Sequence, residues 1–194
     1  MSGAAPAPLG PGALVLVVGP SGAGKDTLMA AAQADLADRA DIHMARRRVT
    51  RTDTTGEDHT PIDPAVFEAD LAAGLYPLSW RAHGLAYALG PEVADAIRAG
   101  RTVMANGSRA TLPEARRRFA RLHVVLVTAP PAVLAARLSA RGRESADDVA
   151  ARLARAPEVD LQADLIIQNV GAVADGARRL ADFVRAIRAP VAAG

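Results

Sequence analysis

The chain has 194 residues, half of them hydrophobic, and a formal net charge of +2. This size and composition suit one globular domain, and the small net charge gives no reason to expect a nucleic-acid partner. Without cysteine there is no disulfide framework or cysteine metal site, and no apolar run reaches the roughly 18 residues of a membrane span, so a cytoplasmic protein is expected. Residues 1–12 lack the basic start and apolar core of a signal peptide and are predicted to form a disordered leader before a single domain, 13–190.

A glycine-rich turn follows the first predicted strand, which is the wholly apolar segment 13–18. Gly19, four further residues and then Gly24-Lys25 have the spacing of a phosphate-binding P-loop, and a helix is expected from Asp26 to about Asp38. Backbone N–H groups of such a turn, together with the positive end of the helix, surround phosphate oxygens. The predicted nucleotide-binding residues are Gly19, Pro20, Ser21, Gly22, Ala23, Gly24, Lys25, Asp26 and Thr27.

The residue after the P-loop lysine departs from the usual pattern. A Ser or Thr hydroxyl ordinarily binds Mg²⁺ there, whereas this chain has Asp26 followed by Thr27. Both are candidate metal residues, because Mg²⁺ prefers hard oxygen ligands, and an acid of the following segment stays an alternative. Lys25 is the only lysine of the chain, which favours a dedicated role on the β- and γ-phosphates.

Beyond the first helix, strands alternate with helices, which predicts a doubly wound parallel sheet of the α/β class. The segment from about 45 to 88 interrupts this alternation and is expected to be a small inserted substrate-binding subdomain. Its expected parts are a short strand within 45–51, a polar loop at 52–64, a short helix from Pro64 and a hairpin at 78–87. Further strands are expected at 102–106, 122–128 and 164–169, and further helices at 91–99, 112–120, 131–141, 146–156 and 173–187.

Five further stretches carry a resemblance together with the P-loop: RRVTR (47–51), GEDH (56–59), SWRAHGLAY (79–87), NGSR (106–109) and the arginine-rich segment 137–144. Of these, SWRAHGLAY together with NGSR is much more specific than the P-loop. Together these stretches resemble the ribose 1,5-bisphosphate phosphokinases, guanylate kinase relatives of phosphonate metabolism, over about 14–170. The resemblance implies a P-loop kinase fold with a helical lid at about 137–156, and ATP and Mg²⁺ as cofactors. It also implies transfer of a phosphate to the 1-phosphate of ribose 1,5-bisphosphate, giving 5-phospho-α-D-ribose 1-diphosphate (PRPP).

The resemblance also implies roles for single residues. Arg51 and Tyr87 match phosphate-binding positions, and Arg141 and Arg143 match lid arginines that neutralise the transferring phosphoryl group. The implied catalytic residues are Lys25, Arg141 and Arg143. The implied substrate-binding residues are Arg48, Arg51, Glu57, Asp58, His59, Ser79, His83, Tyr87, Asn106 and Arg109.

Two alternatives stay open beside this interpretation. A nucleoside monophosphate kinase, guanylate kinase included, would read guanine with carboxylates at two positions where this chain has Ser79 and Asn106. A catalytically dead guanylate kinase-like interaction module would lose its phosphate-binding residues, which are intact here. Arg46, Arg47 and Arg48 alternate faces on a strand, so only some of them can face the site. The oligomeric state, monomer or homodimer, is not determined by the sequence.

Overall fold

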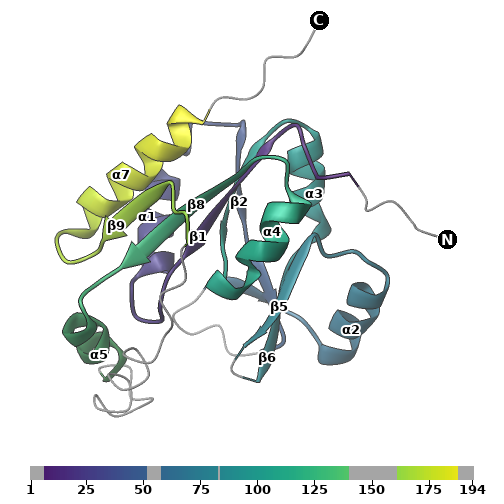
Figure 1. Cartoon of the computed structure of the whole chain (residues 1–194), viewed down its shortest axis with the longest axis horizontal. Helices are drawn as coiled ribbons and strands as arrows, with labels where there is room; N and C mark the ends of the chain where they lie inside the picture. The colour runs from purple at the N-terminus through teal and green to yellow at the C-terminus, as the bar shows by residue number, and fades with distance from the viewer. Residues whose placement is uncertain (1–6, 52–57, 83, 140–160, 188–194) are drawn as a thin grey trace, which may run out of the picture.

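The central sheet of the fold carries five parallel strands in the order β2-β7-β1-β8-β9 (Figure 1). The computed structural model describes residues 7–51, 58–82, 84–139 and 161–187. The predicted doubly wound α/β class is confirmed. The strands are β1 (Ala13–Val18), β2 (Ile42–Ala45), β7 (Thr102–Asn106), β8 (Leu122–Thr128) and β9 (Leu165–Gln168).

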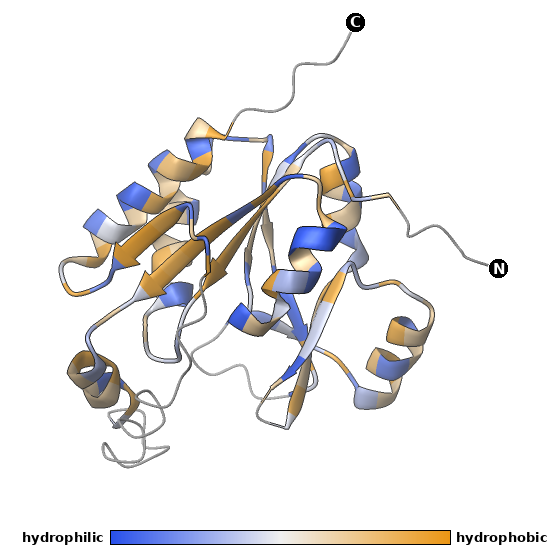
Figure 2. Cartoon of the chain, in the orientation of Figure 1, coloured by the Kyte–Doolittle hydropathy of each residue, from blue (hydrophilic) through white to orange (hydrophobic). Residues whose placement is uncertain are grey.

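Helices cover both faces of this sheet (Figure 1). Helices α1 (Lys25–Asp35) and α7 (Val173–Ala186) pack on one face with Val15 and Val17, while α3 (Pro91–Arg98) and α4 (Leu112–Arg118) pack on the other with Leu14 and Leu16. All six residues of β1 are fully buried, which explains why its sequence is apolar throughout and does not alternate. Figure 2 shows the same division, with hydrophobic central strands between helices whose outer faces are hydrophilic.

A second, four-stranded sheet in the order β4-β3-β6-β5, called here the small sheet, forms within the expected insert. Its strands are β3 (Arg47–Val49), β4 (His59–Pro61), β5 (Leu78–Ala82) and β6 (Leu85–Leu89). Helix α2 (Pro64–Ala72) covers one face through Phe67, and the Asp63 carboxylate caps this helix by accepting from the Ala65 N–H at 2.8 Å. Leu78 and Leu89 on the other face join the core under α3 and α4, so the small sheet is fixed against the central domain.

One strand at the entrance to the small sheet was not expected from the sequence. The short strand expected within 45–51 is present as Arg47–Val49, but Ile42–Ala45, directly before it, is an additional edge strand of the central sheet. Neither β2 nor the three-residue β4 has a continuous apolar run. For this reason the sequence gives no clear signal that these segments form strands.

Part of the expected leader is placed against the domain. Leu9 forms an isolated bridge with Phe119, and its N–H donates to the Arg118 carbonyl at 2.7 Å. Within the described ranges, no helix combines the length and apolar character needed to cross a membrane.

Because two histidines are half-buried, we expect the free energy of unfolding to decrease in mild acid. Burial lowers the pKa of His43, with Arg101 acting in the same direction, and burial also lowers the pKa of His123. The unfolded chain then binds protons more readily than the folded one, so the free energy of unfolding falls as the pH drops below about 6.5. Urea unfolding at pH 7.5 and 5.5 measures this loss. In the double variant His43→Gln/His123→Gln, the free energy of unfolding should depend less on pH. An unchanged pH dependence would show that these two histidines do not cause the loss.

Candidate active site

The P-loop joins β1 to α1 at the carboxyl edge of the central sheet. Gly22 and Gly24 have φ angles of +81° and +87°, in the left-handed region that glycine adopts without strain. The Lys25 ammonium donates to the carbonyl oxygens of Gly19 and Pro20 at 3.0 and 3.1 Å, so the lysine curls back over the loop. This backbone shape, a lysine at its rim and a helix N-terminus behind it are what phosphate binding needs.

The P-loop is supported from behind by two later segments of the chain. A Cβ atom on Gly24 would lie 2.4 Å from Asn169 Nδ2. The buried Asn169 amide donates to the Ala23 carbonyl at 2.8 Å. Arg137, near the end of α5 (Pro131–Ser139), donates to the Asn169 carbonyl at 2.9 Å. Asn169 was not among the site residues predicted from the sequence, although its place directly after a parallel strand was a usable signal.

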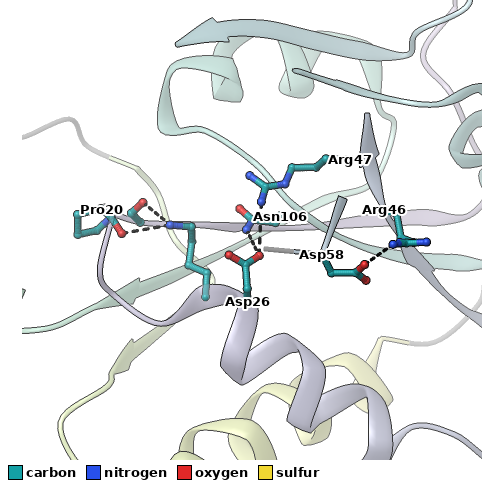
Figure 3. Close-up of polar contacts among 8 residues, drawn as sticks. Pro20, Asp26, Arg46, Arg47, Asp58 and Asn106 are labelled. Atoms are coloured by element: carbon teal, nitrogen blue, oxygen red, sulfur yellow. Dashed lines mark hydrogen bonds and ion pairs between the residues drawn. The ribbon is translucent and has the colours of Figure 1, made fainter. Parts of the chain in front are cut away.

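Asp26 connects the P-loop to two other elements. Its Oδ1 accepts from Asn106 Nδ2 at 2.6 Å and lies 3.5 Å from Arg47 Nη2 (Figure 3). Asn106 is the last residue of β7 and is 4% exposed, and its Oδ1 has no hydrogen-bond partner among the described residues. The amide expected to face the substrate therefore also fixes the P-loop carboxylate.

Aromatic rings continue from Arg47 across the small sheet. The Arg47 guanidinium carbon lies 5.9 Å from the ring centroid of Tyr87, which stacks on Trp80 at 5.4 Å with an interplanar angle of 4°. Ser79 pairs with Ala88, so strand alternation puts it on the opposite face of the small sheet from this stack. The predicted phosphate residue Tyr87 therefore lies beside Arg47, whereas Ser79 does not.

Arg48 lies on the α2 side of the small sheet. Its guanidinium is 3.2 Å from Glu92 Oε2 and 3.7 Å from Asp70 Oδ2, and it covers the ring of Tyr76 at 5.8 Å. The structure thus brings the neighbouring Arg47, which the sequence left uncommitted, to the P-loop acid. Because side chains alternate along a strand, Arg47 and Arg48 lie on opposite faces of the small sheet.

The remaining candidates are divided between buried and exposed positions. His59 is 1% exposed, and its Nε2 donates to the Arg51 carbonyl at 3.3 Å. Asp58 is exposed and forms an ion pair with Arg46 at 2.5 Å (Figure 3). Arg109 opens the short turn after β7 and is half-buried, and Thr27 is exposed on α1. Glu57, His83, Arg141 and Arg143 lie outside the described residues.

The oxygen ligands around Asp26 suit a magnesium ion that is also bound by substrate phosphates and water. They do not suit a metal ion bound by protein side chains alone. Across the described ranges, no three His, Asp or Glu side chains are grouped as a metal cage. Mg²⁺ usually binds one or two carboxylates together with substrate phosphates and water. The Asp26 carboxylate beside the phosphate loop, with the Asn106 oxygen next to it, matches that arrangement.

A P-loop at the carboxyl edge of a parallel sheet, facing a small inserted sheet, defines the class of P-loop nucleotide-binding kinases. Residues 14–160 match the family model described as an AAA domain. The fold is similar to guanylate kinase from Anaplasma phagocytophilum, with a TM-score of 0.67 at 16% identity, over 90% of this chain and 85% of that one.

Sequence relatives define the family more narrowly. The chain is 50% identical over 176 residues to ribose 1,5-bisphosphate phosphokinase PhnN of Methylobacterium radiotolerans, which covers 91% of this chain and 99% of the relative. It is 46% identical over 188 residues to the protein of the same name from Pseudofrankia inefficax, over 96% and 98% of the two chains. The chain belongs to the ribose 1,5-bisphosphate phosphokinase family, which confirms the resemblance seen in its motifs.

Proposed function

We propose that this protein transfers the γ-phosphate of ATP to the 1-phosphate of ribose 1,5-bisphosphate, giving PRPP, in phosphonate catabolism. The observation that carries the proposal is the 50% identity to the Methylobacterium radiotolerans relative along 99% of that protein. The geometry of the P-loop supports ATP as the donor, because its glycines, Lys25 and the N-terminus of α1 lie together in one turn.

On the donor side, Lys25 would leave the carbonyls of Gly19 and Pro20 and bind the β- and γ-phosphates. Asp26 would hold Mg²⁺, with its carboxylate oriented by Asn106 at 2.6 Å, and Thr27 is the other candidate. When bound, Mg²⁺ neutralises charge on the phosphates of the nucleotide. The support for Asp26 is its contact set, since Thr27 is exposed on the helix surface.

On the acceptor side, the nucleophile is already a phosphate oxygen. A phosphate monoester has a second pKa of about 6, so this oxygen is anionic at neutral pH and needs little help from a general base. Positioning and charge neutralisation therefore contribute most of the rate. We assign Arg51 and Tyr87 to the acceptor phosphates, and Asp58 and Arg109 to its surroundings. Arg141 and Arg143 are assigned to the transferring phosphoryl group.

Phosphorus NMR with ATP·Mg²⁺ tests the acceptor directly. New diphosphate signals are expected with ribose 1,5-bisphosphate and none with GMP, because the described site has an amide at Asn106 where guanine recognition uses a carboxylate. Transfer to GMP would make this a divergent nucleotide kinase. Failure to bind ATP in calorimetry would instead favour a dead interaction module.

A further inference from the structure

A buried arginine of the small sheet lies between the two halves of the site. Arg47 is 8% exposed, and its guanidinium lies 3.5 Å from the Asp26 carboxylate and 5.9 Å from the centroid of the Tyr87 ring. Figure 3 shows the Arg47 guanidinium directed at Asp26, which lies between Arg47 and helix α1. We propose that Arg47 binds the acceptor phosphate that becomes phosphorylated, and that Asp26 holds this guanidinium until the acceptor binds. This inference rests on the proposed function, which supplies the acceptor.

The burial of Arg47 explains why it has an acidic partner. A guanidinium stays charged at every physiological pH, and a buried charge is costly unless an opposite charge compensates it. Asp26 provides that charge, yet the distance of 3.5 Å is at the long end for a hydrogen bond. The same Asp26 oxygen accepts from Asn106 at 2.6 Å, so Arg47 is the looser of its two partners.

A phosphate is a better partner for this guanidinium than the carboxylate. Guanidinium–phosphate pairs form two parallel hydrogen bonds of about 2.7–2.9 Å. Arg47 can therefore exchange Asp26 for a phosphate while the bond between Asp26 and Asn106 stays in place. The site of exchange lies beside Tyr87, which matches a phosphate-binding position of the family.

The exchange would couple the two substrates. Mg²⁺ on Asp26 would neutralise the carboxylate and weaken its hold on Arg47, which would then be available to the acceptor. Acceptor bound to Arg47 would in turn leave Asp26 available to the metal, since coupling between two ligands is reciprocal.

Calorimetric titration of ribose 1,5-bisphosphate, without nucleotide or metal, tests the roles of Arg47 and Asp26. Substitutions at the two residues should change the affinity in opposite directions. Arg47→Met should weaken binding by about tenfold or more, the loss expected for hydrogen bonds to a charged group. Asp26→Asn keeps an oxygen for Asn106 but removes the competing charge, so binding should become about three- to fivefold tighter. The double variant should bind like Arg47→Met alone, because Asp26 acts through Arg47.

Arg81→Met is the matched control. Arg81 is on the same small sheet and also has an acidic partner, Glu68 at 2.6 Å, but its side chain is 62% exposed, and its loss should leave binding unchanged. Thermal unfolding checks that Arg47→Met is folded. If it is not, Arg47→Lys keeps the charge without the planar fork and should still bind the acceptor more weakly than wild type.

The possible outcomes separate this inference from the proposed function. No binding of the acceptor by the wild type, either alone or with a non-hydrolysable ATP analogue and Mg²⁺, would overturn both. Equal binding by the wild type and Arg47→Met would overturn the role of Arg47 and leave the proposed function standing. An equal gain from Asp26→Asn with and without Arg47 would show that Asp26 repels the ligand directly, which would overturn its role in holding Arg47.

Discussion

Replacement of Lys25 by methionine is expected to lower kcat by about 10²–10³-fold, the usual loss when one charge-stabilising donor is removed from a transferring group. Methionine keeps most of the length of the side chain and removes the ammonium, which now donates to two loop carbonyls and is assigned to the β- and γ-phosphates. The fold should persist, because the loop shape comes from its glycines and from the support of Asn169. Initial rates with saturating ATP, together with thermal unfolding, measure both effects.

The single lysine offers an independent check by protein chemistry. An amine-reactive acylating reagent can modify only Lys25 and the terminal amine, because the chain has no other lysine. ATP·Mg²⁺ should protect Lys25 from modification and leave the terminal amine as an internal control, with both sites read by mass spectrometry. Full activity of the methionine variant, or modification of Lys25 that ATP does not slow, would refute its catalytic role.

Substitution of Gly19 by alanine is expected to have the largest effect on stability. Gly19 has a φ of +150°, and a Cβ atom there would lie 2.0 Å from the carbonyl oxygen of Val127 in the adjacent strand β8. That oxygen belongs to the backbone of a buried parallel strand, so it has little freedom to move away. Overpacking and backbone strain together predict a loss of roughly 2–5 kcal/mol in the free energy of unfolding, along with the loss of detectable ATP binding.

Gly100→Ala is the control for this substitution. Gly100 also has a positive φ, +79°, but a Cβ atom there would meet no other atom within 4 Å. The strain of the backbone alone should cost about 1–2 kcal/mol, with ATP binding retained. Urea unfolding of both variants separates the conformational strain from the effect of the close approach of the P-loop to β8. Equal losses in the two variants would mean that the contact with Val127 is not what restricts position 19.

The donor side of the site has a clearer pattern in the sequence than the acceptor side. The P-loop is local: nine consecutive residues carry its glycines, its lysine and the start of its helix, so spacing alone identifies it. The small sheet depends on strand register, and a shift of one residue moves a side chain to the other face. The resemblance implied Arg48 as a substrate residue, whereas the structure directs Arg47 to Asp26 and Arg48 to Glu92.

The spacing of residues along the sequence did not predict contacts between distant segments. Asn106 was singled out because it replaces an acid of the guanylate kinases, but its bond to Asp26, 80 residues earlier, depends on β1 and β7 being neighbours in the sheet. The sequence predicted that both strands exist, without their order. The only sequence signal of Asn169 is its place at the end of a predicted strand, and its bond to Ala23 depends on the meeting of strand ends at one edge of the sheet.

The hydrogen bond from Asn169 to Ala23 also bears on how the molecule is made. The two residues are 146 positions apart, so the phosphate loop leaves the ribosome long before its support is synthesised. Chains are made from the N-terminus, and segments that need distant partners must wait for them. A nascent chain that ends before β9 therefore carries the complete phosphate-binding motif without the side chain that braces it. The capacity to hold a nucleotide would then appear late in synthesis and mark a finished chain.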